Sequence, residues 1–189
     1  MTKLFQPTQN QIKSSNLYFY EDYLNQNYKK KFKNYSQLWN WSVKNPIDFW
    51  KSITEFYQVP ITKNKNSKII QKNAQFWKNN FFFNFQTNYF QLIEKNKSNS
   101  LAIHFLGENN YEEKITYRDL NLRVNTLSSY YRSLGIKKGD VVVGYLPNIA
   151  DTIIAFLASA KIGAVWSSCS SDFGAKAVID RFSQLKPKL

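Results

Sequence analysis

The clearest pattern of hydrophobic and polar positions lies in the C-terminal part of the chain. Residues 141–146 form a short apolar run rich in β-branched side chains, which predicts a strand buried on both faces. Residues 152–162 place apolar side chains at helical spacing, and Gly163 follows where a left-handed backbone often ends a helix. A second apolar run covers residues 164–168, and a second helix is predicted to start near Phe173. This order predicts a βαβ unit whose parallel strands are joined by a right-handed crossover.

Both helices of this unit have apolar faces that should pack inward. The predicted inner face of the first helix consists of Ile153, Ile154, Phe156, Leu157 and Ala160. The predicted inner face of the second consists of Ala177, Val178, Phe182 and Leu185. Residues 167–172 are polar and are predicted to form the loop between the second strand and the second helix.

A hairpin and a long helix are predicted directly before this unit. Residues 101–105 alternate in hydrophobicity, residues 107–110 have turn chemistry, and residues 114–116 return as a strand. Thr116 and Asp119 resemble a capping box at the start of a helix that Gly135 would end. The apolar face of that helix is predicted to contain Leu120, Val124, Leu127, Tyr131 and Leu134.

The N-terminal part predicts helices separated by short connections. Residues 1–13 are expected to be extended, since Pro7 disfavours a helix, and Ser15 is expected to cap the helix that follows. Residues 35–41 suggest a short aromatic helix, and Asn45 before Pro46 is a helix start. The apolar stripe predicted for this last helix contains Ile47, Trp50, Ile53, Phe56 and Tyr57.

Two further segments complete the N-terminal part. Residues 61–68 are polar and are predicted to be a linker, whereas residues 76–90 are dense in aromatic side chains and are predicted to pack as a core. The predicted fold class is therefore α/β. A helical, aromatic-rich extension over residues 1–100 precedes the first, incomplete part of a parallel-sheet large domain over residues 101–189.

Composition narrows the classes of partner. The formal net charge is +13, but lysine outnumbers arginine 22 to 4, which indicates codon bias more than a phosphate-binding surface. We therefore expect no nucleic-acid partner, although a basic aromatic module that binds nucleic acid or protein remains an alternative. No apolar run reaches the length of a membrane span, so we expect a cytoplasmic protein without a membrane partner.

Few side chains offer chemistry. One cysteine excludes an internal disulfide, and one histidine excludes a multi-histidine metal site. Cys169 would need His104 as a base to act as a nucleophile, so a buried Cys169 and a surface His104 are the favoured interpretations. The turn over residues 135–139 lacks the Lys-Ser/Thr ending of a phosphate loop. Lys29–Lys33 is expected to be a solvated helix end.

Several motifs of the C-terminal part resemble a known family. Residues 145–149, 163–170, 172–174 and 180–182 resemble the acetoacetyl-CoA synthetase branch of the acyl-adenylate-forming (AMP-binding) enzymes. Ser171 departs from that pattern, where proline is expected. Residues 76–90 resemble the aromatic segment that precedes the large domain in this branch, with its asparagine pair at Asn84 and Asn88.

The resemblance implies a ligase that converts acetoacetate to an acyl-adenylate with ATP and Mg²⁺ and then forms acetoacetyl-CoA, AMP and pyrophosphate. It also implies that Ser170, Ser171 and Asp172 lie beside the nucleotide of CoA, although these residues could instead only shape a turn. No catalytic or metal-binding residue is predicted within the chain. We therefore expect an N-terminal fragment that is inactive and binds cofactors poorly without its missing C-terminal part. A synthetase for acetate or propionate remains an alternative.

Overall fold

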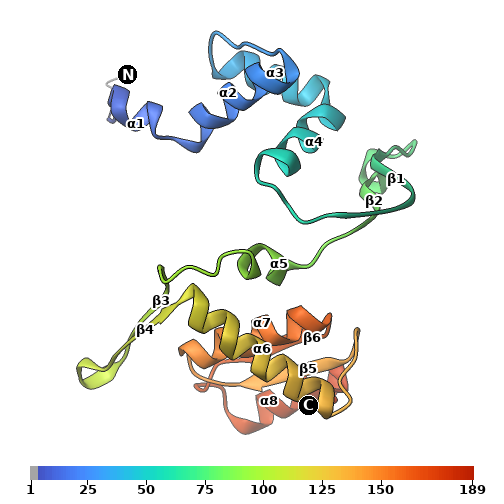
Figure 1. The fold of residues 1–189 in the computed structure, drawn as a ribbon. Helices are drawn as coiled ribbons and strands as arrows, with labels where there is room; N and C mark the ends of the chain where they lie inside the picture. Colours follow the sequence, from blue (N-terminus) through green and yellow to red (C-terminus); the bar gives the residue numbers. More distant parts are fainter. Residues whose placement is uncertain (1–3) are drawn as a thin grey trace. The chain divides into compact units, whose positions relative to one another are not determined.

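The computed structural model describes residues 4–189. The chain divides into two compact units, Met1–Gln86 and Thr87–Leu189. Figure 1 shows helices followed by a hairpin in the first unit, and mixed helices and strands in the second. The α/β class and the helical N-terminal extension are confirmed. The domain boundary at residue 100 remains a prediction.

Four helices open the first unit. Their bounds are α1 (Gln9–Lys13), α2 (Asn16–Tyr28), α3 (Tyr35–Lys44) and α4 (Pro46–Phe56). Ser15 caps α2 as predicted, since its side chain accepts a hydrogen bond from the Tyr18 amide. The prediction of an extended arm is wrong for residues 9–13, because Thr8 forms a capping box with Gln11 and starts α1. Residues 1–3 lie outside the described residues.

The core of the first unit is small and aromatic. Tyr20, Leu24, Leu38 and Trp41 are its buried members. The Tyr20 and Ser52 hydroxyls lie 2.7 Å apart within it, and Ser52 is fully buried. The predicted stripe of α4 is only half confirmed. Ile53 and Phe56 pack against this core, whereas Ile47, Trp50 and Tyr57 are exposed.

A hairpin ends the first unit. It consists of β1 (Thr62–Gln71), the short 3₁₀ helix η1 (Phe76–Lys78) and β2 (Asn80–Gln86). The prediction of a linker over residues 61–68 is wrong, because the polar strand β1 pairs antiparallel with the phenylalanine-rich β2. The prediction of an aromatic core is wrong at the tip, where Phe76 is 78% exposed and Trp77 67%. A two-stranded hairpin has too little apolar surface around its tip to bury them.

The second unit contains four strands, in two pairs, together with helices. These are α5 (Tyr89–Glu94), β3 (Leu101–Leu106), η2 (Glu108–Asn110), β4 (Glu112–Thr116), α6 (Tyr117–Ser133), β5 (Val141–Tyr145), α7 (Ala150–Ile162), β6 (Val165–Cys169) and α8 (Ala175–Leu185). β3 and β4 form the predicted antiparallel hairpin. Thr116 caps α6, its hydroxyl oxygen accepting from the Asp119 amide at 3.1 Å.

The predicted parallel pair is confirmed. β5 and β6 are adjacent and parallel, with Val141 opposite Val165 and Tyr145 opposite Cys169, and α7 connects them. Gly163 ends α7 with φ of 75°. The predicted loop starts too early, because residues 167–169 belong to β6 and pair with β5.

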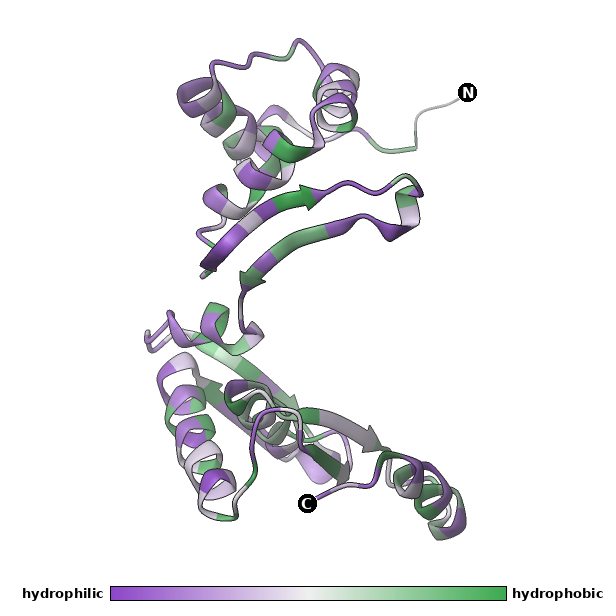
Figure 2. Ribbon diagram, turned by 90° about the vertical axis from the view of Figure 1, so that its right-hand side faces the viewer, coloured by the Kyte–Doolittle hydropathy of each residue, from purple (hydrophilic) through white to green (hydrophobic). Residues whose placement is uncertain are grey.

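One face of β5 belongs to a continuous core. Phe90, Ile115, Val124, Val142 and Leu157 are among its buried members, so α5, β4, α6, β5 and α7 all contribute. Burial of β5 on both faces is wrong, since Val141 and Val143 are only half-buried and Tyr145 is exposed. Among the helices that cover this core, α6 has both hydrophobic and hydrophilic positions, as expected of a surface helix (Figure 2).

The predicted helix faces of the second unit are partly wrong. The core side of α7 contains Ile154, Leu157 and also Ser159, whereas Ile153 is 41% exposed. In α8, Val178 is buried but Leu185 is 39% exposed. Helical spacing alone predicted too many buried side chains, because the face of each helix that packs against the rest of the unit is narrower than its apolar stripe.

The last two residues continue the hydrogen bonding of β5. The Val143 amide donates to the Leu189 carbonyl at 2.8 Å, and the Lys188 amide donates to the Val141 carbonyl at 2.8 Å. Lys188 Nζ also lies 2.8 Å from Asp140 Oδ2. β5 is therefore hydrogen-bonded on both sides, to β6 on one and to residues 188–189 on the other.

Candidate functional site

The candidate site is the turn that follows β6 at the carboxyl end of the parallel pair. Ligand crevices of α/β sheets commonly lie outside the carboxyl ends of parallel strands. Here β5 ends at Tyr145 and β6 ends at Cys169, directly opposite each other. The turn, residues 170–174, contains the predicted site residues Ser170, Ser171 and Asp172, all of which are exposed.

The turn is closed by its own backbone and by one side chain from β5. The Phe173 amide donates to the Ser170 carbonyl at 3.2 Å, and the Leu146 amide donates to the Cys169 carbonyl at 3.3 Å. The Tyr145 hydroxyl lies 3.0 Å from the Ser171 carbonyl oxygen and 2.7 Å from that of Phe173. Because a phenol has one proton, the two carbonyls share a single donor.

Charge at the turn comes from Asp172. A hydrogen bond from the Ser170 side chain, aided by the Asp172 amide, lowers the pKa of the Asp172 carboxyl. The carboxylate is therefore ionised at neutral pH and offers acceptors to solvent. Beside it, the Arg181 guanidinium lies 4.4 Å from the centre of the Phe173 ring, which links the turn to α8.

A glycine in β5 accommodates the tryptophan of β6. The Trp166 indole lies across Gly144, where an added Cβ would be 2.5 Å from Trp166 Cη2. Trp166 also packs against the core of the second unit. The missing side chain at Gly144 therefore leaves room for the Trp166 indole, one residue before the Tyr145 contact.

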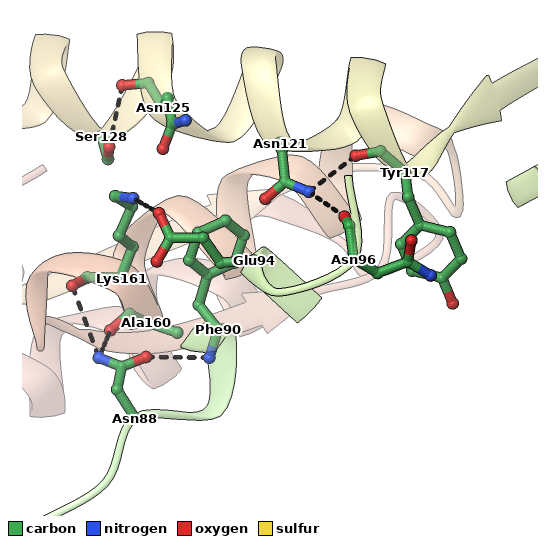
Figure 3. Close-up of polar contacts among 10 residues, drawn as sticks. All are labelled: Asn88, Phe90, Glu94, Asn96, Tyr117, Asn121, Asn125, Ser128, Ala160 and Lys161. Atoms are coloured by element: carbon green, nitrogen blue, oxygen red, sulfur yellow. Dashed lines mark hydrogen bonds and ion pairs between the residues drawn. The ribbon is translucent and has the colours of Figure 1, made fainter. Parts of the chain in front are cut away.

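A polar network links the segment before β3 to α6 and α7 (Figure 3). The Asn88 side chain donates to the Ala160 carbonyl at 2.7 Å, and its oxygen accepts from the Phe90 amide at 2.9 Å. Asn88 thus caps the start of α5 and the end of α7 together. Lys161 Nζ reaches Glu94 Oε1 at 2.5 Å and lies 4.8 Å from the Phe90 ring centre.

Asn121 ties the same segment to α6. Its side-chain amide donates to the Asn96 and Tyr117 carbonyls, each at 2.8 Å (Figure 3). Its Oδ1 is buried without a hydrogen-bond partner. Asn88 was singled out by the sequence, but its two caps and the role of Asn121 were not, because both depend on carbonyls distant along the chain.

Cys169 and His104 have the structural roles that the sequence favoured. Cys169 is free and buried at the end of β6. His104 is on β3, with Nε2 2.6 Å from Glu112 Oε1, and the Lys114 ammonium and then His104 lower the pKa of the Glu112 carboxyl. No Cys–His catalytic pair is formed by these two residues.

The Gly135 and Gly139 amides of the turn over residues 135–139 are already hydrogen-bonded to groups outside it. The Gly135 amide donates to the Arg132 carbonyl in α6 and the Gly139 amide to the Gly163 carbonyl after α7, both at 2.9 Å. These two amides are therefore not free to form a phosphate cradle. Within residues 4–189, we find no cluster of three or more His, Cys, Asp or Glu suited to a metal ion.

The parallel pair and the turn lie in a region of the chain that matches a known protein family. Residues 91–189, which include the parallel pair and the turn, match the model of the AMP-binding enzyme family. The chain belongs to the AMP-binding enzyme family. The match begins inside α5 and contains Tyr145, the turn and α8, so the candidate site lies within the family region.

Individual relatives of this AMP-binding chain include acetoacetyl-CoA synthetases. It is 37% identical to the one from Mus musculus over 82% of its own length and 24% of the relative's. It is 30% identical to the one from Rhizobium meliloti over 98% of the chain and 28% of the relative. A solved acetoacetyl-CoA synthetase from Streptomyces lividans matches 99% of the chain and 29% of that protein, with a TM-score of 0.88 and 28% identity. The predicted resemblance is confirmed, and the chain spans about a quarter of the length of these relatives.

None of the described helices is long and apolar enough to cross a membrane.

Proposed function

We propose that this chain forms the N-terminal part of an acid–thiol ligase that makes acetoacetyl-CoA. The observation that supports this most strongly is the likeness to the Streptomyces lividans acetoacetyl-CoA synthetase, which extends over both units of the chain. The first unit lies entirely outside the region matched by the family model, so likeness there favours this branch over AMP-binding enzymes in general.

The proposed reaction has two steps that balance chemically. An acetoacetate carboxylate oxygen bonds to the α-phosphorus of ATP, and pyrophosphate leaves. The CoA thiolate then bonds to the acyl carbon, and AMP leaves. The mixed anhydride of the first step supplies the good leaving group of the second, while Mg²⁺ would neutralise phosphate charge. No residue of this chain is assigned to either bond-forming step.

We assign the chain's contribution to the second step, as one wall for the nucleotide of CoA. Ser170, Ser171 and Asp172 are exposed at the carboxyl edge of β5 and β6. The ionised Asp172 carboxylate can accept hydrogen bonds from the amino group of an adenine base, and the serine hydroxyls can donate or accept. The turn would orient the coenzyme, whose reacting sulfur lies far from its base.

The experiment is acetoacetate-dependent exchange of labelled pyrophosphate into ATP. It should be run on residues 1–189 and on a protein that also carries the sequence encoded downstream. We expect exchange only from the longer protein, because the turn over residues 135–139 lacks the Lys-Ser/Thr ending of a phosphate loop and no residue of the chain is assigned to a bond-forming step. Exchange driven by acetate or propionate but not by acetoacetate would favour the alternative synthetases instead. Exchange by residues 1–189 alone, free of host enzyme, would overturn the assignment of chemistry to other residues.

A bulky substitution separates the two steps. Ser171→Trp in the longer protein should impair formation of the thioester while leaving pyrophosphate exchange intact, since the turn is assigned only to CoA. The matched control is Ser133→Trp, because Ser133 is equally an exposed serine of the second unit, at the end of α6. Equal loss of both steps in Ser171→Trp would argue against the CoA wall.

A further inference from the structure

We infer that Tyr145 is a positioning residue whose hydroxyl holds the 170–174 turn in the shape that receives the CoA nucleotide. This inference rests on the proposed function, because it gives the turn a ligand. It also assigns Tyr145 a role that motif matching does not reveal. Its side chain belongs to β5, whereas the groups it holds lie on the turn after β6.

The strand register brings the hydroxyl to the turn. Tyr145 is the last residue of β5 and is paired with Cys169, the last residue of β6. Alternation along a strand places Tyr145 on the same face as Val141 and Val143, away from the buried Val142. The tyrosine ring is thus free to extend past the end of the sheet, where it is 47% exposed.

The turn depends on few contacts. Its residues Ser170, Ser171 and Asp172 are exposed, and α8 begins after Gly174 without a side-chain cap. The Tyr145 hydroxyl lies within hydrogen-bond distance of two carbonyls two residues apart, so its one proton restrains both peptide groups as a shared donor. The Phe173 ring beneath Arg181 and the hydrogen bond from Ser170 to Asp172 are further side-chain contacts that bear on this shape. A turn this exposed has little buried area to hold it without the hydroxyl.

The chemical consequence is a preformed recognition surface. With the Ser171 and Phe173 carbonyls turned toward Tyr145, the Asp172 side chain between them is left facing solvent, where the Ser170 side chain hydrogen-bonds to it. Loss of the phenolic proton donor would free both carbonyls to rotate toward water. The ligand would then have to order the turn on binding, which weakens affinity without touching the bond-forming groups.

The first test follows the turn without any ligand. In Tyr145→Phe, NMR hydrogen exchange at the Phe173 amide of residues 1–189 should be about 2- to 10-fold faster than in the parent chain, as expected for loss of one net hydrogen bond. The matched control is Tyr130→Phe, which removes a hydroxyl from a tyrosine 57% exposed on α6. Unchanged exchange at Phe173 in Tyr145→Phe would overturn the inference whatever the turn binds.

The second test uses the longer enzyme. Tyr145→Phe should raise the KM for CoA several-fold while kcat and pyrophosphate exchange stay near the parent values. Faster Phe173 exchange with an unchanged KM would instead overturn the proposed CoA wall and leave Tyr145 as a structural residue. If Tyr145→Phe lowers protection throughout α6 and α7, Arg181→Leu serves as the second variant. It removes the stacking on Phe173 and should raise the same KM, and an unchanged KM would count against the inference.

Discussion

The two units of this chain have similar fractions of hydrophobic residues, 34 of 86 and 47 of 103, but those of the first are mainly aromatic and those of the second mainly aliphatic. In the second unit, eleven buried hydrophobic residues, from five elements and from the turn at Ile136, form one core, whereas the first unit has a cluster of four. A cavity of about 330 Å³ opens among α2, α3 and α4 in the first unit, lined in part by Tyr35, Trp39 and Tyr57. Hydrophobic content therefore does not determine how much of a core a segment forms by itself.

The second unit and the helices of the first unit also differ in the groups that their long-range hydrogen bonds join. In the second unit, Asn88 and Asn121 bond to backbone carbonyls of helices or segments distant in sequence. Among the helices of the first unit, the long-range polar contacts join side chains, as between Tyr28 and Glu55 at 2.6 Å. Burial and this carboxylate raise the pKa of Tyr28. Asn88 and Asn121 thus hold backbone groups of the second unit directly, whereas the helices of the first unit are joined side chain to side chain.

The largest effect is expected from Phe90→Ala in the second unit. Phe90 is 1% exposed and packs in the core under Lys161, so its removal leaves a cavity and should cost about 3–5 kcal/mol of unfolding free energy. Chemical denaturation followed by hydrogen exchange in α6 and α7 would measure this. Leu122→Ala is the control, because Leu122 is 65% exposed on α6 and its loss should change stability by less than about 0.5 kcal/mol.

Leu24→Ala tests the smaller core of the first unit. Leu24 is fully buried, so the cost to that unit should be about 2–4 kcal/mol, seen as loss of amide protection in α2 and α4. Trp39→Ala is the control, since Trp39 is 53% exposed and lines the cavity. If Trp39→Ala destabilised α2 and α4 as much as Leu24→Ala, the contrast between buried and exposed hydrophobic side chains would be wrong.

Asn88→Ala should have a smaller effect that is specific to helix ends. It removes the cap of α5 and the donor to the Ala160 carbonyl, which together should cost about 1–3 kcal/mol. Asn88→Asp keeps the acceptor for the Phe90 amide but loses the donor, so α5 should retain protection while the end of α7 loses it. Equal losses at both helices in the two variants would contradict the double cap.

The smallest effect concerns pH at the turn before β5. The Lys188 ammonium and then the Lys137 amide lower the pKa of the Asp140 carboxyl. This group therefore stabilises the fold above its unfolded pKa, about 3.9, and the contribution is lost as the pH falls through its lower folded pKa. NMR titration should show the Lys137 and Lys188 amides losing protection together below about pH 4. In Asp140→Asn this step should disappear.

Sequence reasoning succeeded where local rules and the tertiary structure agree. The βαβ unit, Gly163 and the cap at Thr116 followed from short apolar runs, a glycine with positive φ and a side-chain acceptor. The prediction of an extended N-terminal arm was wrong because a capping box at Thr8 starts a helix despite the nearby Pro7. The prediction of a linker over residues 61–68 was wrong because β1 is a polar strand. It forms by pairing with β2, and no local pattern in residues 61–68 encodes that pairing.

The candidate site was predicted only in part for a similar reason. Ser170, Ser171 and Asp172 were indicated by their motif and do lie together on one exposed turn. Tyr145 was quoted only as part of a motif, because its contact depends on the register between β5 and β6. A tyrosine at the last position of a strand, before a proline, was the available signal, since an exposed ring at a sheet edge can reach across to the next loop.

Photolabelling of the longer enzyme tests the placement of the coenzyme most directly. A CoA analogue with an azide on its adenine should label the tryptic peptide of residues 162–176, which contains the turn, and excess CoA should remove that label. Mass spectrometry would locate the modified residue. Competed labelling at residues 170–174 is the predicted result. Competed labelling in residues 1–86, with none in the 162–176 peptide, would contradict the assignment of the CoA wall to the second unit.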